Sequence, residues 1–329
     1  MLTAVAAVGA VLIVMLLWYL AALIFRLRFQ FSVRSLLLLM VAMALPCSWL
    51  AAEMKKARQQ ASDRDELWRE GVTIMFDNYM GPHPGPPAAM WLLRHFGYSF
   101  FSEIASISPT IFHETRITDT TLEKLEGLTA LQSLDLHETK VTDAGLDNLK
   151  GFTALQTLRL DNTKVTDAGL AQIRGLAALK SLDLHLTGVT DAALDHLKDL
   201  KRLEELWLDG TGVTDRGLEK LRGLTALQEL SLSWTKVTDA GLNNLKGLTA
   251  LQDLTLSRTK VTDAGLDNLK GLTALERLYL DHTKVTDPGL DNLKGLIALQ
   301  LLDLRDTYVT DDGVNKLQRE LPKCKIISR

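Results

Sequence analysis

A repeat of 24 residues constrains the fold of this chain more than any other feature of its sequence. The copy at 128–151 reads LTALQSLDLHETKVTDAGLDNLKG, and seven more copies follow without insertion or deletion, starting at Phe152, Leu176, Leu200, Leu224, Leu248, Leu272 and Leu296. A less regular ninth copy, 104–127, precedes them. A fixed period of this kind is typical of solenoids, because each copy buries its apolar side only by stacking on its neighbours. We therefore expect nine stacked coils over residues 104–319.

Each copy predicts a short strand followed by a short helix. In the first regular copy, Leu134 and Leu136 alternate with polar residues, as in a strand that buries one face. Asp143 is the predicted N-cap of the helix, and Gly151 suits a left-handed C-cap. In a later copy Pro288 follows the equivalent aspartate, as expected near a helix start. The sequence thus predicts an α/β solenoid, with a parallel sheet on the concave face and short helices on the convex face.

The consensus LxxLxxLxLxxTxVTDxGLxxLxG resembles that of leucine-rich-repeat proteins, in particular the F-box-type and ribonuclease-inhibitor-like class. In that class a buried small polar residue, often Cys or Asn, precedes the TDxGL segment. Here the position is threonine in all nine copies, from Thr115 to Thr307. An inward hydroxyl can bond backbone groups in the turn that would otherwise be buried without a partner. The resemblance implies that these threonines and the aspartates after them belong to the scaffold.

Two apolar runs precede the repeats. Residues 2–25 carry no charge and are long enough to cross a bilayer, and 35–52 form a second uncharged run. We expect residues 1–52 to be a membrane anchor with two transmembrane helices; one span, a signal-peptide core or a buried helix are the alternatives. The charged segment 53–71 is then a juxtamembrane stalk. Residues 72–103 are expected to cap the first coil and 320–329 the last, where Ile326 and Ile327 are predicted to form an edge strand.

The side of the membrane on which the repeats lie follows only from a resemblance. Basic residues flank the second run on both sides, so the charge rule gives no orientation. The segment RFQFSVRSLLLLMVAMALPCSWLA resembles the anchor of bacterial membrane-tethered leucine-rich-repeat proteins, in which the repeats lie beyond the anchor. This resemblance implies a bacterial inner-membrane protein with an extracytoplasmic repeat domain.

Composition and motifs exclude several functional classes. The net charge of −3 gives no argument for nucleic-acid binding, and two cysteines predict neither a disulfide framework nor a metal motif. The sequence contains no nucleophile motif, no phosphate-binding glycine loop and no zinc spacing. We therefore expect a non-catalytic protein without a cofactor.

The variable positions of the repeats supply the candidate sites, because they flank the inward leucines while the scaffold stays fixed. One group has the residue types of a cation site; its members are His113, Glu114, His137, Glu138 and Asp161. A solvated polar face is the favoured interpretation, since two rigid strands rarely bring ligands together without a loop. If the group does hold an ion, divalent metal should raise the melting temperature.

A second group contains the residue types that dominate binding hot spots. Trp234 and Arg258 occupy equivalent positions in consecutive copies and can form a cation–π pair. The predicted partner-binding residues are Trp207, Trp234, Arg258, Arg277, Tyr279, His185 and Asp209. The leading hypothesis is a membrane-anchored scaffold that binds a protein or peptide on its concave face. The alternative is a cell-envelope carbohydrate-binding module in which the aromatic residues stack on sugar rings; an intracellular adaptor and an enzyme fit the sequence less well.

Overall fold

The computed structural model describes residues 72–76, 104–109, 117–125 and 129–328, all of which belong to one compact unit. The predicted anchor, the stalk and most of the predicted N-terminal cap lie outside these ranges. Within them, no helix is long and apolar enough to cross a bilayer.

The strands form a single 11-stranded sheet in chain order. The first pair is antiparallel, β1 (Val72–Phe76) with β2 (Ile104–Pro109), and every later pair is parallel. Each strand pairs with the equivalent residues of the next copy, so that Leu134 lies opposite Leu158. The remaining strands are β3 (Ser133–Asp135), β4 (Thr157–Arg159), β5 (Ser181–Asp183), β6 (Glu205–Trp207), β7 (Glu229–Ser231), β8 (Asp253–Thr255), β9 (Arg277–Tyr279), β10 (Leu301–Asp303) and the predicted edge strand β11 (Lys325–Ile327).

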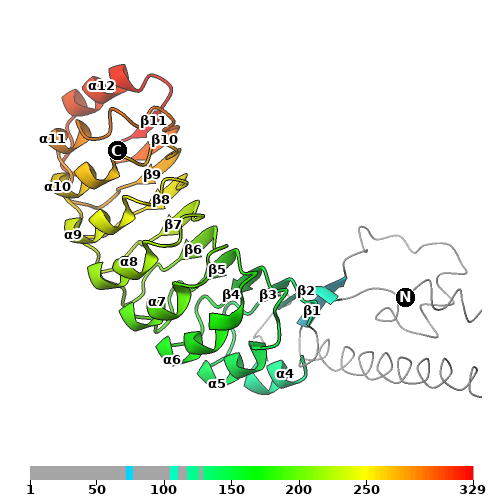
Figure 1. Cartoon of the computed structure of the whole chain (residues 1–329). Coiled ribbons are helices and arrows are strands. Elements are labelled where there is room, and N and C mark those ends of the chain that lie inside the picture. Colours follow the sequence, from blue (N-terminus) through cyan, green and yellow to red (C-terminus); the bar gives the residue numbers. More distant parts are fainter. Residues whose placement is uncertain (1–71, 77–103, 110–116, 126–128, 329) are drawn as a thin grey trace, which may run out of the picture. The chain divides into compact units, whose positions relative to one another are not determined.

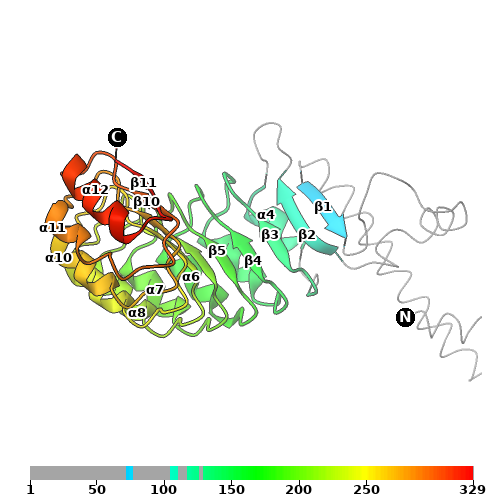
Figure 2. The ribbon, with the colours of Figure 1, turned by 90° about the horizontal axis from the view of Figure 1, so that it is seen from above.

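Helices follow the outer side of the coils and strands the inner side (Figure 1). Viewed from above, successive strands from β1 to β5 lie side by side in chain order (Figure 2). The predicted concave parallel sheet and convex helices are therefore confirmed. The helices are α4 (Asp119–Glu123), α5 (Asp143–Leu146), α6 (Asp167–Leu170), α7 (Asp191–Leu197), α8 (Asp215–Leu221), α9 (Asp239–Leu242), α10 (Asp263–Leu266), α11 (Asp287–Leu290) and α12 (Asp311–Glu320), with 3-10 turns at η2 (Asp147–Leu149), η3 (Ala171–Gly175), η4 (Asn243–Leu245) and η5 (Asp267–Leu269).

The core between the two layers is a ladder of leucines and valines. Leu158 and Leu160 of one coil are fully buried, and so are their equivalents in the next coil, Leu182 and Leu184. The predicted threonine ladder lies beside them. In each coil the hydroxyl donates to a carbonyl three residues earlier, as Thr163 Oγ1 does to Leu160 O at 2.6 Å. The same bond is formed by Thr139, Thr187, Thr211, Thr235, Thr259, Thr283 and Thr307, whereas Thr115 lies outside the described residues.

The predicted N-cap is wrong by one residue. The cap of α5 is Thr142, whose side chain accepts from Ala144 N, and Asp143 is the first helical residue. The Asp143 carboxylate instead reaches the next coil, where it accepts from Thr166 N at 2.7 Å and from Thr166 Oγ1 at 2.6 Å. This contact between coils, which we call the Asp–Thr clasp, recurs from Asp119 to Asp287.

The clasp also explains the glycine of the TDxGL segment. A Cβ atom on Gly169 would lie 2.4 Å from Asp143 Oδ1, so the carboxylate occupies the space of a side chain. The exceptions in this column are Thr121 in the first copy and Ala193, and at Ala193 the Asp167–Thr190 bonds keep lengths of 2.7 and 2.6 Å. A single methyl group is therefore accommodated by a small shift, and glycine is favoured without being obligatory.

The predicted left-handed cap is also wrong, because Gly151 is not in that conformation. Positive φ angles occur instead in the turn after each of β3–β10, at Gly210 and at seven other residues: Glu138, Asn162, Leu186, Trp234, Arg258, His282 and Asp306. The reason is a backbone bond between coils. Trp234 N, for example, donates to Ser257 O at 3.0 Å, which extends the parallel ladder past the end of the strand.

Candidate interaction surface on the strand face

The strand face is the side of the sheet opposite to the buried leucines. Its side chains form four rows that run across β3–β10, with neighbours in a row about 4.8 Å apart. The first row is Ser133, Thr157, Ser181, Glu205, Glu229, Asp253, Arg277 and Leu301, and the second is Asp135, Arg159, Asp183, Trp207, Ser231, Thr255, Tyr279 and Asp303. The third is His137, Asp161, His185, Asp209, Ser233, Ser257, Asp281 and Arg305, and the turn row is Glu138, Asn162, Leu186, Gly210, Trp234, Arg258, His282 and Asp306.

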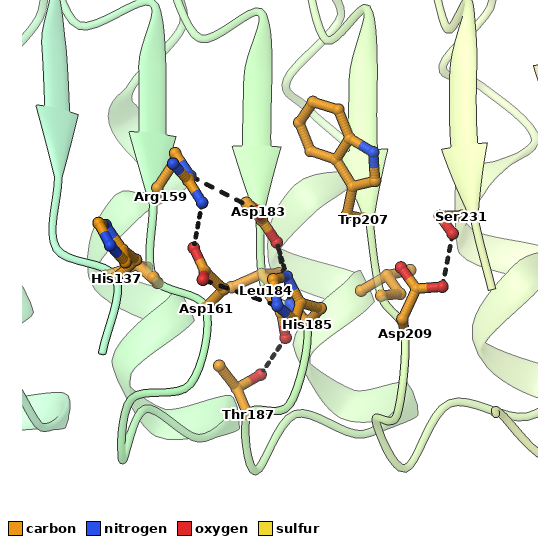
Figure 3. Close-up of polar contacts among 12 residues, drawn as sticks. His137, Arg159, Asp161, Asp183, Leu184, His185, Thr187, Trp207, Asp209 and Ser231 are labelled. Atoms are coloured by element: carbon orange, nitrogen blue, oxygen red, sulfur yellow. Dashed lines mark hydrogen bonds and ion pairs between the residues drawn. The ribbon is translucent and has the colours of Figure 1, made fainter. Parts of the chain in front are cut away.

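A polar network crosses β4 and β5 at one end of this face (Figure 3). His185 Nδ1 lies 2.7 Å from Asp183 Oδ1, and His185 Nε2 lies 3.6 Å from Asp161 Oδ2. The guanidinium of Arg159 lies 3.4 Å from Asp161 Oδ1 and 3.7 Å from Asp183 Oδ2. One imidazole and one guanidinium thus bridge two carboxylates on neighbouring strands.

Asp161 is the most constrained member of the network. Only 4% of the residue is exposed, and burial raises the pKa of its carboxyl group. The charge of Asp183 raises this pKa further, while Arg159 and His185 lower it. Because Asp161 Oδ1 receives no hydrogen bond, the guanidinium at 3.4 Å is its principal electrostatic partner.

The predicted cation group is only partly brought together. His113 and Glu114 lie outside the described residues, Glu138 is an exposed turn residue, and His137 Nδ1 is bound to Asp135 at 2.7 Å. Asp161 clusters instead with Asp183 and His185, whose ligand-type atoms lie within 4.8 Å of one another. Arg159 faces both carboxylates of this cluster, so the chain supplies a cation of its own. The sequence did not point to Arg159 and Asp183 as members of this cluster, because they lie in the second row. The cation candidates came from the third row and the turn row.

The middle of the strand face is built around Trp207. Its Nε1 donates to Glu229 Oε1 at 2.8 Å, which fixes the indole against the next strand. Burial raises the pKa of Glu229; the bond from Trp207 lowers it, and the charges of Asp253 and Glu205 raise it. Asp209 Oδ1 accepts from Ser231 Oγ at 2.5 Å and from Ser233 N at 2.9 Å.

The turn row holds the exposed large hydrophobic side chains of the described strand face. Leu186 is 58% exposed and Trp234 is 63% exposed. Arg258 Cζ lies 4.4 Å from the centroid of the Trp234 ring, so the predicted cation–π contact is present. Arg258 Nη2 also lies 2.7 Å from His282 Nε2. Leu186 and His282 were not predicted as site residues, although the column that contains Trp234 and Arg258 includes both.

The predicted partner-binding residues do not form one cluster. Trp207 and Tyr279 lie in the same row, but Ser231 and Thr255 separate them. Arg277 is bound to Asp253, and His185 and Asp209 belong to the contacts described above. The residues are therefore spread over β5–β9 and their turns, as expected for an extended surface rather than a pocket.

Comparison with known proteins agrees with this architecture. The family model described as leucine-rich repeat matches residues 223–245. Comparison with curated proteins gave no match. An internalin C2 from Listeria monocytogenes is 26% identical to this chain, with a TM-score of 0.50, and the alignment covers 64% of this chain and 84% of the internalin.

Two further solved structures support the fold alone. An internalin from Listeria monocytogenes is 24% identical with a TM-score of 0.55, and a leucine-rich-repeat protein from Leptospira interrogans is 22% identical with a TM-score of 0.50. The alignments cover 63% and 62% of this chain, and it spans 56% of each of those proteins. Repeat consensus, family match and solenoid geometry agree, and the chain is a leucine-rich-repeat protein.

Proposed function

We propose that this protein is a non-catalytic scaffold that binds a protein or peptide partner on its strand face. The observation that carries the proposal is the exposure of Leu186 and Trp234, at 58% and 63%, beside the sheet. The leucines of the consensus are buried and form the core, whereas these two exposed side chains contribute little to it. Large exposed apolar and aromatic side chains on a rigid concave surface are typical of protein-binding sites.

The chemistry of the described residues supports a role without catalysis. His137 and His185 are bound through Nδ1 to carboxylates, and no hydroxyl or thiol nucleophile contacts either ring in this part of the chain. Burial raises the pKa of the Cys324 thiol to about 11, so this thiol is protonated at neutral pH. An activated nucleophile needs an adjacent base, and these groups lack that arrangement.

The proposal includes a membrane anchor. The anchor rests on the uncharged runs 2–25 and 35–52. The resemblance of the segment RFQFSVRSLLLLMVAMALPCSWLA to bacterial membrane anchors supports repeats on the extracytoplasmic side of an inner membrane. Protease treatment of intact spheroplasts tests the orientation: repeats outside the cytoplasm are digested without lysis, whereas cytoplasmic repeats are protected until the membrane is opened.

A carbohydrate ligand is the second candidate, because Trp207, Trp234 and Tyr279 offer aromatic rings. The geometry favours it less than a peptide. Arg258 covers one face of the Trp234 ring, and two strands separate Trp207 from Tyr279. Competition with cell-envelope glycans therefore forms one arm of the test below.

The test is capture of partners from native membranes by three forms of the full chain. The first is the unaltered protein, and the second carries Leu186→Ala and Trp234→Ala. The third is a control with Ile297→Ala and Tyr308→Ala, which removes two exposed apolar side chains, 82% and 69% exposed, outside the four rows. The proposal predicts a protein captured by the first and third forms and lost from the second. Equal capture by all three contradicts it, and release by glycans would favour the carbohydrate alternative.

A further inference from the structure

Arginines neutralise most acidic groups of the first two rows of the strand face. Arg277 is bound to Asp253 through both Nε and Nη2. Arg305 forms a two-pronged contact with Asp303. At the other end, Arg159 lies 3.4 Å from Asp135 as well as facing the carboxylates of β4 and β5. Arginine suits this role because its planar guanidinium matches the geometry of a carboxylate.

Strands β6 and β7 depart from this pattern. Their row positions hold three carboxylates, Glu205, Asp209 and Glu229, and no basic residue. Glu205 lies opposite Glu229, which lies opposite Asp253, so three acidic residues follow one another along the first row. Among the described residues, no lysine or arginine forms an ion pair with Glu205 or Glu229. Arg277 lowers the pKa of Glu229, but by less than burial and the charges of Asp253 and Glu205 raise it.

Trp207 adds a second attraction for a cation at the same place. Its indole lies in the second row of β6, next to Glu205 in the first row, and its Nε1–H is bound to Glu229. The face of an indole attracts a guanidinium through the ring quadrupole. The turn row shows that this chain already uses the contact, since Arg258 lies over Trp234.

We propose that an arginine side chain of the partner docks over β6 and β7, between the carboxylates of Glu205 and Glu229 and beside the Trp207 ring. The inference rests on the proposed function and specifies the partner as a protein or peptide segment with an exposed arginine. The guanidinium would supply the cation that these strands lack, in the way that Arg277 does for Asp253. Arginine is favoured over lysine because one planar group can bind a carboxylate and stack on an indole together.

The test measures binding of a fluorescein-labelled peptide of alternating glycine and arginine to the full chain by fluorescence anisotropy. Matched peptides replace arginine with lysine or with citrulline, which keeps the shape of arginine without its charge. The site variant carries Glu205→Gln and Glu229→Gln. The control variant carries Asp147→Asn and Asp267→Asn on the helical side, where each aspartate forms an ion pair with an exposed lysine three residues on, and it changes the net charge equally. Thermal unfolding of each variant checks that it is folded.

The proposal predicts that arginine binds more tightly than lysine, and lysine more tightly than citrulline. The site variant should lose about tenfold in affinity for the arginine peptide, while the control variant should keep it. Equal losses in both variants, equal binding of citrulline, or no binding at millimolar peptide would each overturn it. The capture experiment separates the two proposals. If Leu186→Ala with Trp234→Ala releases the partner while Glu205→Gln with Glu229→Gln retains it, the scaffold function stands and the arginine site does not.

Discussion

Replacing Asp239 with alanine removes an Asp–Thr clasp from the middle of the solenoid. The Asp239 carboxylate accepts from Thr262 N at 2.7 Å and from Thr262 Oγ1 at 2.6 Å. Both atoms belong to the next coil, so the clasp joins α9 to the cap of α10. The substitution leaves a partly buried backbone N–H without its acceptor, and water replaces the carboxylate only in part.

The magnitude follows from the number and kind of these bonds. A hydrogen bond to a charged group contributes about 1.5–3 kcal/mol, and partial exposure places each of these two near the lower limit. We therefore expect Asp239→Ala to lower the free energy of unfolding by about 3 kcal/mol. In Asp239→Asn one oxygen still accepts from Thr262 N, so the loss should be about 1 kcal/mol.

Urea unfolding followed by circular dichroism measures the difference, with Asp267→Ala as the control. Asp267 lies in the same coil as Thr262 and pairs with Lys270 at the surface, so its removal should leave the unfolding curve unchanged. At about 2–4 °C per kcal/mol, Asp239→Ala should also melt roughly 6–12 °C lower. If Asp239→Ala unfolds like Asp267→Ala, the clasp does not hold adjacent coils together and the reasoning is refuted.

Three other predictions follow from the fold and the site. Leu186→Gly should raise the free energy of unfolding by about 0.5–1 kcal/mol, because glycine adopts the observed φ of 54° without strain, and Gly210→Ala should lower it in the same urea assay. Glu229→Gln keeps an acceptor for Trp207 and removes a half-buried charge. Since folding raises the pKa of Glu229, protonation of this group stabilises the folded state at low pH. This stabilisation is lost as the pH rises and the group ionises. The variant should therefore be more stable than the unaltered protein at pH 7, and the difference should vanish below about pH 4, as unfolding at several pH values would show. Cys324 should resist iodoacetamide at pH 8 until urea unfolds the chain, and peptide mapping would reveal early labelling if its pKa were not raised.

The repeat period predicted the fold because every copy buries equivalent side chains, so that the copies can stack on one another only in register. The alternation around Leu134 and Leu136 is visible within one copy, and so is the threonine that bonds the turn. The Asp–Thr clasp was not predicted, since Thr142 and Asp143 are adjacent and both residue types cap helices. Only the position of the next coil shows that the aspartate reaches across to Thr166.

The turn conformation and the polar network were harder to predict for different reasons. Glycine marks a left-handed turn in one copy only, at Gly210, while turn residues such as Trp234 and Arg258 have the same conformation together with a backbone bond between coils. The Trp234–Arg258 contact was predicted, because equivalent positions lie one strand apart. The role of Arg159 depends on side chains that cross between rows, which a column of equivalent residues does not reveal.

Site-specific photocrosslinking tests the claim that the strand face is the interaction surface most directly. Benzoylphenylalanine is placed at position 234 in the full chain and, in a second form, at position 297, where the side chain is also exposed but lies outside the four rows. Irradiation of intact cells followed by mass spectrometry then identifies covalent adducts. The account predicts a discrete protein adduct from position 234 and none from position 297. The same adducts from both positions, or none from position 234, would contradict it.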